Sequence, residues 1–160
     1  MDGICLRPIG IIRTPHSQVS GMPIQPCGAD RVTGTIEIHA EFVAGLADLE
    51  GFSHVWLIYH LHQNQRPCLR VKPFLDDAEH GIFATRSPSR PNPVGLSLVT
   101  LVAVNGNRLM VENIDVLDGT PLLDIKPFVP AFDSVSDPRI GWYEGKLEKA
   151  VTTRSDRRFV

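Results

Sequence analysis

The sequence predicts a mainly β fold, namely a small antiparallel β-barrel of about seven strands with one or two short helices. Thirteen prolines and thirteen glycines are spread along 160 residues and divide the chain into short segments. Most of these segments are rich in β-branched residues, which favours strands. Strands do not alternate with long helical patterns, so a doubly wound nucleotide-binding fold is disfavoured.

The expected strands are the β-rich segments between these breaks. They cover residues 4–13, 31–39, 53–62, 68–74, 81–85, 95–104 and 108–116. The clearest hairpin joins residues 96–104 to residues 109–116 through Asn105-Gly106, which supplies the positive φ angles of a type I′ turn.

Two short helical segments are expected beside the strands. Within residues 41–49, the apolar residues Phe42, Leu46 and Leu49 have helical spacing. A second helix is expected to begin near Asp137-Pro138, because proline fits the first turn of a helix.

The length and composition predict one domain with one core, since 42% of the 160 residues are apolar. Residues 1–144 are expected to form the barrel, and residues 145–160 a loosely ordered C-terminal tail. A run of eighteen apolar residues and a secretory leader are both missing from the sequence, so we expect a soluble, cytoplasmic protein that makes no membrane contact. Three widely spaced cysteines without a CxxC pair predict free thiols.

The net charge of −2 does not indicate a protein that holds nucleic acid by bulk charge, so any RNA contact must come from local patches. Two groups of arginines qualify. They are Arg86 with Arg90, and Arg154 with Arg157 and Arg158 near the C-terminus. The alternative for the second group is a solvated tail.

The segment Gly81–Ser97 is rich in proline, which blocks helix and stiffens the backbone around Arg86 and Arg90. Two guanidinium groups on a stiff loop suit a phosphate, a carboxylate or a stacked base. The alternative is that these arginines form ion pairs with acidic residues of the chain itself. The acidic residues nearest in sequence are Asp76, Asp77 and Glu79.

Two further segments carry chemically interesting side chains. Pro121 and Pro127 bracket a short strand that places Asp124 and Lys126 on one face, as either a site or an ordinary surface ion pair. In the other segment three histidines share one face of a strand, and two of them form an i, i+2 pair that can chelate a metal. They are His54, His60 and His62. With no third ligand evident, we expect no metal; instead one histidine bonds a ligand or the backbone, while Trp56 and Tyr59 fill the core.

The segments GIFATRSPSRPNPVGLS and DVLDGTPLLDIKPF closely resemble the signature of the TrmO, or TsaA-like, family. The blocks IGIIRTPH, QP and LEGFSHVW are similar to the other blocks of that family, in the same order, across residues 7–133. This resemblance implies a homodimeric β-barrel methyltransferase. Its implied reaction moves the methyl group of S-adenosylmethionine to N6 of N6-threonylcarbamoyladenosine at position 37 of tRNA, in the anticodon loop.

The resemblance also implies roles for individual residues. The implied cofactor-binding residues are Pro26, Cys27, Gly28, His62, Gln63, Arg86, Leu96, Glu112, Asn113, Ile114 and Asp115. The expected RNA-binding residues are Arg90, Arg154, Arg157 and Arg158. Candidates for the group that takes the proton from the acceptor nitrogen are Asp118, Asp124 or a histidine, and Asp124 is our hypothesis.

Two other functions remain open at this point. One is a methyltransferase with the same pocket that acts on a small metabolite, which the acidic net charge favours. The other is a non-catalytic module whose arginine-bearing loop binds a phosphorylated ligand.

Overall fold

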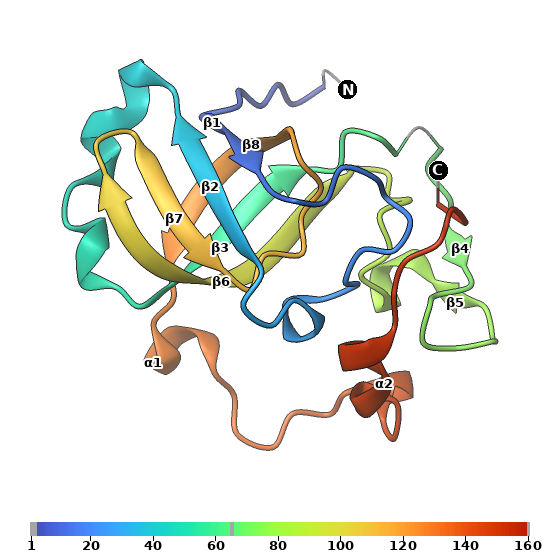
Figure 1. Cartoon of the computed structure of the whole chain (residues 1–160). Coiled ribbons are helices and arrows are strands. Elements are labelled where there is room, and N and C mark those ends of the chain that lie inside the picture. Colours follow the sequence, from blue (N-terminus) through green and yellow to red (C-terminus); the bar gives the residue numbers. More distant parts are fainter. Residues whose placement is uncertain (1–2, 65, 160) are drawn as a thin grey trace.

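The computed structural model describes residues 3–64 and 66–159. Within these residues a closed antiparallel barrel has the strand order β1-β2-β7-β6-β3-β8 (Figure 1). The strands are β1 (Gly10–Arg13), β2 (Thr33–Ile38), β3 (His54–His60), β6 (Val94–Asn105), β7 (Arg108–Glu112) and β8 (Thr120–Pro127). Closure pairs both edges of every strand, which removes the free edges that favour aggregation. The predicted fold class is confirmed, with six strands in the barrel in place of about seven.

The barrel interior is a packed hydrophobic core. Alternate residues of each strand point inward, so that Val55, Leu57 and Tyr59 of β3 are buried while the residues between them face outward. The other large, fully buried side chains come from every part of the barrel. They include Ile12, Ile36, Val99, Leu109, Val111, Ile114 and Leu122. Each such side chain contributes about 1.5–3 kcal/mol when removed from water, so this core stabilises the barrel.

The β6–β7 hairpin differs from its prediction at the turn. Asn105 pairs with Arg108, so the two loop residues are Gly106 and Asn107. Only Gly106 has a positive φ angle, 60°, as in a type II′ turn. Strand β6 ends at Asn105, one residue later than expected, because Asn105 pairs with Arg108. The side-chain amide of Asn107 stabilises the turn, since its Nδ2 donates to the carbonyl of Ile38 at 3.1 Å.

Three strand predictions need correction. Residues 4–9 do not join β1, where Pro8 lacks an amide hydrogen for the ladder. Segments 68–74 and 81–85 contribute only β4 (Arg70–Val71) and β5 (His80–Gly81), a small separate ladder. Residues after β5 instead form the 3₁₀ helix η4 (Ile82–Ala84), because the hydroxyl of Thr85 bonds the carbonyl of Ile82.

The short strand predicted between Pro121 and Pro127 is confirmed as β8, which closes the barrel between β1 and β3. Strand β7, by contrast, is shorter than predicted. It ends at Glu112, because Asn113 adopts a left-handed conformation with φ 63°.

The helical prediction for residues 41–49 holds in part. This segment forms two 3₁₀ helices, η2 (Ala40–Leu46) and η3 (Leu49–Gly51), separated near Asp48, whose φ is 66°. The predicted apolar face is correct, since Phe42, Leu46 and Leu49 pack against the barrel core.

The helix predicted near Asp137-Pro138 is wrong. Asp137 has a φ of 51°, a left-handed conformation that interrupts a helix. Short helices lie on either side of it, α1 (Pro130–Asp133) and η5 (Gly141–Tyr143).

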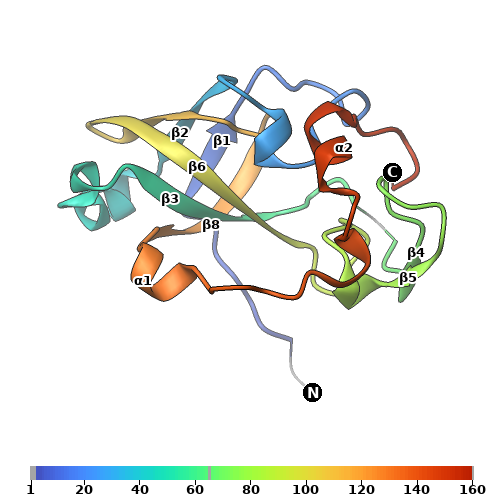
Figure 2. The same ribbon diagram turned by 90° about the horizontal axis from the view of Figure 1, so that it is seen from below.

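The segment expected to be a loose tail is folded against the rest of the chain. It contains α2 (Leu147–Thr152), which contacts the 3₁₀ helix η1 (Pro26–Gly28). Leu147, Ala150 and Val151 have helical spacing, and Ala150 is buried. In Figures 1 and 2, α2 and the C-terminal end lie on the same side of the barrel as β4 and β5. The apolar face formed by Leu147, Ala150 and Val151 explains why this segment packs against the rest of the chain.

Within residues 3–64 and 66–159, the search for a helix with the length and hydropathy of a membrane span finds none.

Candidate functional site

A cavity of about 980 Å³ opens where β3 ends and β6 begins. This volume is typical of a small-molecule site. Seven segments line it: the loop 19–27, the strand ends 59–64 and 94–96, the loops 73–75 and 85–90, the segment 115–120, and the C-terminal segment 140–159. Sequence segments far apart in the chain therefore converge on one pocket.

One wall of the cavity contains a chain of three hydrogen-bonded side chains. Ser97 Oγ lies 2.6 Å from Asp115 Oδ1, and Tyr59 Oη lies 2.9 Å from Ser97 Oγ. An ionised Asp115 only accepts, so Ser97 donates to Asp115 and Tyr59 donates to Ser97. Desolvation raises the pKa of Asp115 to about 6, although the Ser97 hydrogen bond and the charge of Arg86 both act to lower it. Desolvation also raises the pKa of the Tyr59 hydroxyl above its ordinary value.

Gly95 determines where the Tyr59 ring lies. The two residues pair across β3 and β6, and a Cβ atom at position 95 would lie 2.2 Å from Cε2 of Tyr59. Only glycine leaves room for the ring at this position. The ring therefore lies flat against β6, with its hydroxyl directed toward Ser97.

Arg90 stabilises the loop that follows η4. Its Nη1 donates to the carbonyls of Thr85, Ile82 and Ser87 at 2.8, 3.2 and 3.5 Å. Its guanidinium also lies over the Phe83 ring, 5.9 Å from the centroid. Arg90 is thus tied to the backbone of its own loop, a role that its proline-rich sequence did not indicate.

Arg86 projects from this loop at the cavity. Its Nη1 donates to Oε1 of Gln25 at 2.9 Å, and its charge acts on both Asp115 and Tyr59. Among the described residues, neither Arg86 nor Arg90 forms an ion pair with the acidic residues of the 76–79 segment. The alternative of an internal ion pair is therefore wrong, because those carboxylates have nearer partners. The partners are His80 and Lys146 for Asp76, Lys72 for Asp77 and Arg70 for Glu79.

The C-terminal segment forms a second wall. The Ser155 amide donates to the carbonyl of Met22 at 2.9 Å, and two further fastening points hold the segment in place. At the first, Trp142 Nε1 donates to the carbonyl of Ala84 at 2.8 Å, and the indole stacks on His80 and Tyr143 with centroid distances of 4.3 and 3.8 Å. Lys146 bonds Asp76, whose Oδ2 lies 2.9 Å from His80 Nε2. These two partners hold the pKa of Asp76 below its ordinary value.

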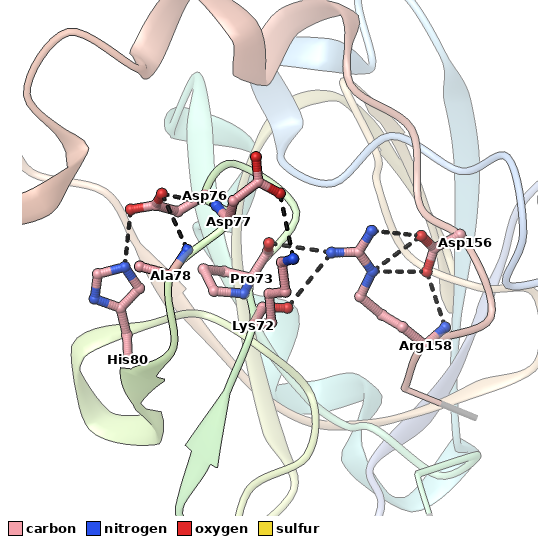
Figure 3. Close-up of polar contacts among 8 residues, drawn as sticks. All are labelled: Lys72, Pro73, Asp76, Asp77, Ala78, His80, Asp156 and Arg158. Atoms are coloured by element: carbon pink, nitrogen blue, oxygen red, sulfur yellow. Dashed lines mark hydrogen bonds and ion pairs between the residues drawn. The ribbon is translucent and has the colours of Figure 1, made fainter.

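The second fastening point is Arg158. Its guanidinium bonds Asp156 at 2.7 Å and the carbonyl of Pro73 at 3.2 Å, and it lies over the Phe74 ring. Figure 3 shows both polar groups side by side, with Asp76 and His80 in one and Asp156 and Arg158 in the other. The chain end is therefore anchored to the loop between β4 and β5.

Most of the cofactor-binding residues implied by the resemblance line this cavity. They are Pro26, Cys27, His62, Gln63, Arg86, Leu96 and Asp115. Four others lie outside it. Gly28 sits beneath α2, where a Cβ atom would be 3.0 Å from the Val151 carbonyl oxygen, and Glu112 belongs to β7. Asn113 bonds Arg31 and Thr100, while Ile114 is fully buried in the core. From Asp115 the cavity lining continues to Val116 and Leu117, which follow it in the sequence.

The structure places Asp124 away from the cavity lining. It lies on β8, where Oδ2 forms an ion pair with Lys126 at 3.1 Å and Oδ1 accepts the amide of Ile125. Asp118 has a structural role, since its Oδ1 accepts the Thr14 amide at 3.0 Å.

The C-terminal arginines mostly bond their own segment. Arg154 donates to the carbonyls of Val151 and Thr153, Arg158 has the partners described above, and Arg157 is exposed. The free-thiol prediction agrees with three exposed, unpaired cysteines. As for the histidines, no cluster of three or more metal-ligating side chains was found in the described part of the chain.

Sequence reasoning missed Ser97 and the C-terminal wall, and it assigned Tyr59 to the core alone. Tyr59 is indeed buried, but Trp56 faces outward and packs edge-on against Phe128. The signal for Ser97 was available: it occupies an inward position of β6, in step with Val99 and Leu101. A polar residue on the apolar face of a strand indicates a buried hydrogen bond.

A closed barrel whose rim carries a mostly apolar cavity, with one desolvated carboxylate and one arginine, defines a small-molecule-binding β-barrel protein. The family follows from sequence comparison. The chain belongs to the family described as the tRNA-methyltransferase O N-terminal domain (TrmO_N), whose model matches residues 11–134. The C-terminal wall of the cavity lies beyond that match.

Three relatives place the chain within this family. A probable S-adenosyl-L-methionine-binding protein of Pyrococcus abyssi is 50% identical over 156 residues, which are 98% of this chain and 85% of that protein. The tRNA (adenine(37)-N6)-methyltransferase of Escherichia coli is 35% identical over 147 residues, which are 86% of this chain and 63% of that protein. The crystal structure of TrmO from Pseudomonas aeruginosa matches with a TM-score of 0.74 and 40% identity, over 88% of this chain and 63% of that one. The chain thus spans less than two thirds of the two latter proteins.

Proposed function

We propose that the protein is an S-adenosylmethionine-dependent methyltransferase that methylates N6 of N6-threonylcarbamoyladenosine at position 37 of tRNA. Family membership and the names of the relatives support the reaction class. The observation that carries the proposal is the cavity, because it gathers Arg86, Leu96 and Asp115 from separate family motifs into one pocket.

The cavity residues suit the charges of this cofactor. S-adenosylmethionine supplies an electrophilic methyl group on a positively charged sulfur. Asp115 provides a negative charge for that end, and Arg86 provides a planar donor fork for a carboxylate. Apolar side chains such as Leu61, Leu96 and Leu117 offer surfaces for the adenine ring.

Transfer of the methyl group forms a carbon–nitrogen bond and breaks the carbon–sulfur bond, and the acceptor nitrogen loses a proton. Positioning of the reactants supplies a large part of such a rate enhancement, on the order of 7–11 kcal/mol. We assign the proton acceptor to Asp115 in place of Asp124. Asp115 lines the cavity and has a pKa of about 6, so it is ionised at neutral pH and basic enough to accept a proton.

The anticodon loop is the proposed source of the acceptor base, which is already single-stranded and costs little to turn out. We keep Arg90, Arg154, Arg157 and Arg158 as RNA-binding residues. Arg90, Arg154 and Arg158 use only some of their five N–H donors on their own chain, so the remaining donors can bind phosphate.

We further propose a homodimer located in the cytoplasm. Exposed apolar side chains on the outer face of β6 and β7 support self-association, since Val102 and Met110 are 50% and 47% exposed beside a shallow groove. Three unpaired, exposed cysteines suit a reducing compartment.

A small metabolite in place of tRNA is the second candidate acceptor. The net charge of −2 and the engagement of Arg90, Arg154 and Arg158 with their own chain favour it.

Transfer of labelled methyl from S-adenosylmethionine distinguishes the two candidates. Purified tRNA that carries or lacks the threonylcarbamoyl group at position 37 is the acceptor. Label only in the modified tRNA supports the proposal. Label in neither tRNA, from a protein that binds the cofactor, supports a small acceptor.

A further inference from the structure

Ser87 has a buried hydroxyl without a partner. The residue is 7% exposed, and its Oγ is the one buried side-chain nitrogen or oxygen among the described residues that forms no hydrogen bond. Buried polar groups are nearly always hydrogen-bonded, so an unpartnered hydroxyl calls for an explanation. Ser87 borders the cavity, which makes a ligand the natural partner.

The backbone around Ser87 is held firmly. The Ser87 amide donates to Thr85 Oγ1 at 3.2 Å, and Arg90 donates to the carbonyls of Thr85 and Ser87. Pro88 follows directly and restricts the conformation of Ser87. Rotation about the Cα–Cβ bond is therefore the main freedom left to the hydroxyl, and it moves Oγ among three staggered positions beside the cavity.

Ser89, two residues later, shows that a satisfied hydroxyl is possible in this loop. It is 4% exposed, and its Oγ accepts a hydrogen bond from Asn64 Nδ2 at 3.0 Å. Both serines are buried, and they differ in whether the protein itself provides a partner for the hydroxyl.

The neighbour of Ser87 indicates the chemistry of the partner. Arg86 lines the same cavity and uses one N–H on Gln25, which leaves other donors of its planar fork. Arg86 and Ser87 both line this cavity, and a guanidinium together with a hydroxyl suits the two oxygens of a carboxylate. The negative charge of Asp115 repels a carboxylate, so Arg86, the positive charge that acts on Asp115, is the complementary place for one in this cavity.

We propose that Ser87 Oγ donates a hydrogen bond to a ligand carboxylate that is held by Arg86. This inference rests on the proposed function, which offers two carboxylates: that of the methionine part of the cofactor, and that of the threonyl group on the acceptor base. The chemistry recognised is the same in both cases.

The test compares Ser87→Ala with the matched control Ser89→Ala. Titration calorimetry measures affinity for S-adenosylhomocysteine and for 5′-methylthioadenosine, which lacks the carboxylate. Methyl transfer measures KM for tRNA bearing the threonylcarbamoyl group. Thermal unfolding measures stability. Removing an unpartnered hydroxyl leaves the Tm of Ser87→Ala unchanged or slightly higher, whereas Ser89→Ala loses a hydrogen bond and its Tm falls.

Loss of a hydrogen bond to a carboxylate weakens binding about tenfold or more. If the cofactor supplies the carboxylate, Ser87→Ala lowers the affinity for S-adenosylhomocysteine by this factor and leaves the affinity for 5′-methylthioadenosine unchanged. If the acceptor supplies it, both affinities stay and KM for the modified tRNA rises by the same factor. If Ser87→Ala leaves both the affinity for S-adenosylhomocysteine and the KM for the modified tRNA unchanged, the inference about Ser87 is wrong, while the proposed function stands. A wild-type protein that binds neither nucleoside refutes the proposed function and, with it, the inference.

Discussion

Ser97 Oγ donates a 2.6 Å hydrogen bond to Asp115 Oδ1, which links the first part of β6 to the chain just beyond β7 at the edge of the cavity. The bond favours the charged form of Asp115, while desolvation disfavours it and dominates, so that the pKa is about 6. The carboxylate thus changes charge just below neutral pH. Because Asp115 lines the cavity, this change of charge alters the affinity of the cavity for a charged ligand.

The first prediction concerns pH. Raising the pH through about 6 ionises Asp115, which then attracts the sulfonium of S-adenosylmethionine but has no such charge to attract in S-adenosylhomocysteine. Titration calorimetry from pH 5 to 8 will show the affinity ratio of the two ligands rise roughly tenfold in favour of S-adenosylmethionine. Both ligands share the same amino and carboxyl groups, so their own titration cancels. In Asp115→Asn the ratio will be flat, and a wild-type ratio that is also flat would exclude a role for this charge.

The second prediction concerns the close packing of Gly95 on Tyr59. Gly95→Ala forces a methyl group within 2.2 Å of the ring, so the ring must move and its bond to Ser97 is lost. Overpacking of this kind costs about 1–3 kcal/mol in the free energy of unfolding, measurable by urea denaturation. Gly81→Ala is the control, since nothing lies within 4 Å of its Cβ position and its φ is −61°. Equal stability of both variants would contradict the close approach.

The third prediction concerns the C-terminal wall. Trp142→Ala removes the hydrogen bond to Ala84 and the stacking on His80 and Tyr143, which anchor the wall at the cavity. Hydrogen exchange of residues 140–159 will quicken, and affinity for S-adenosylhomocysteine will fall several-fold, while exchange of the barrel core stays slow.

Trp56→Ala is a fitting control for this experiment, because Trp56 packs on Phe128 at the outside of the barrel. Unchanged affinity in Trp142→Ala, despite faster exchange of residues 140–159, would mean that the wall covers the cavity without contributing to ligand binding.

The fourth prediction distinguishes two roles of Arg90. If its main role is to bond the carbonyls of its loop, Arg90→Lys will displace Arg86 and weaken both S-adenosylhomocysteine and tRNA. If it acts only on RNA phosphates, tRNA binding will weaken with a shallower salt dependence, while nucleoside affinity stays the same. Our structure predicts the first result, and calorimetry together with salt-dependent tRNA binding measures both.

The sequence indicated much of the fold because prolines and glycines divide it into short segments rich in β-branched residues, and most of those segments form the strands of the barrel. It indicated the segment after β7 less well: the predicted cofactor-binding residues were Glu112 to Asp115, whereas Asp115 to Leu117 line the cavity after the left-handed Asn113. A single positive φ angle at a non-glycine residue is not visible in composition or periodicity.

The C-terminal wall was missed for a different reason. Its anchors depend on long-range partners, such as Lys146 with Asp76 and Arg158 with Pro73, which sequence spacing does not reveal. Arg90 was predicted to bind a ligand because its actual partners are backbone carbonyl oxygens, and the sequence does not show which carbonyls a side chain will reach. The local apolar spacing of α2, by contrast, was present and indicates that the segment is not a solvated tail.

The most direct test of the central claim, that this cavity binds S-adenosylmethionine, is calorimetric titration of that ligand into the wild-type protein and into Arg86→Ala. The structure predicts a wild-type Kd on the order of 1 μM, equivalent to about −8 kcal/mol, and at least about tenfold weaker binding in a variant whose melting temperature is unchanged. No binding by the wild-type protein, or identical affinity in the two proteins, would contradict the assignment of the cavity.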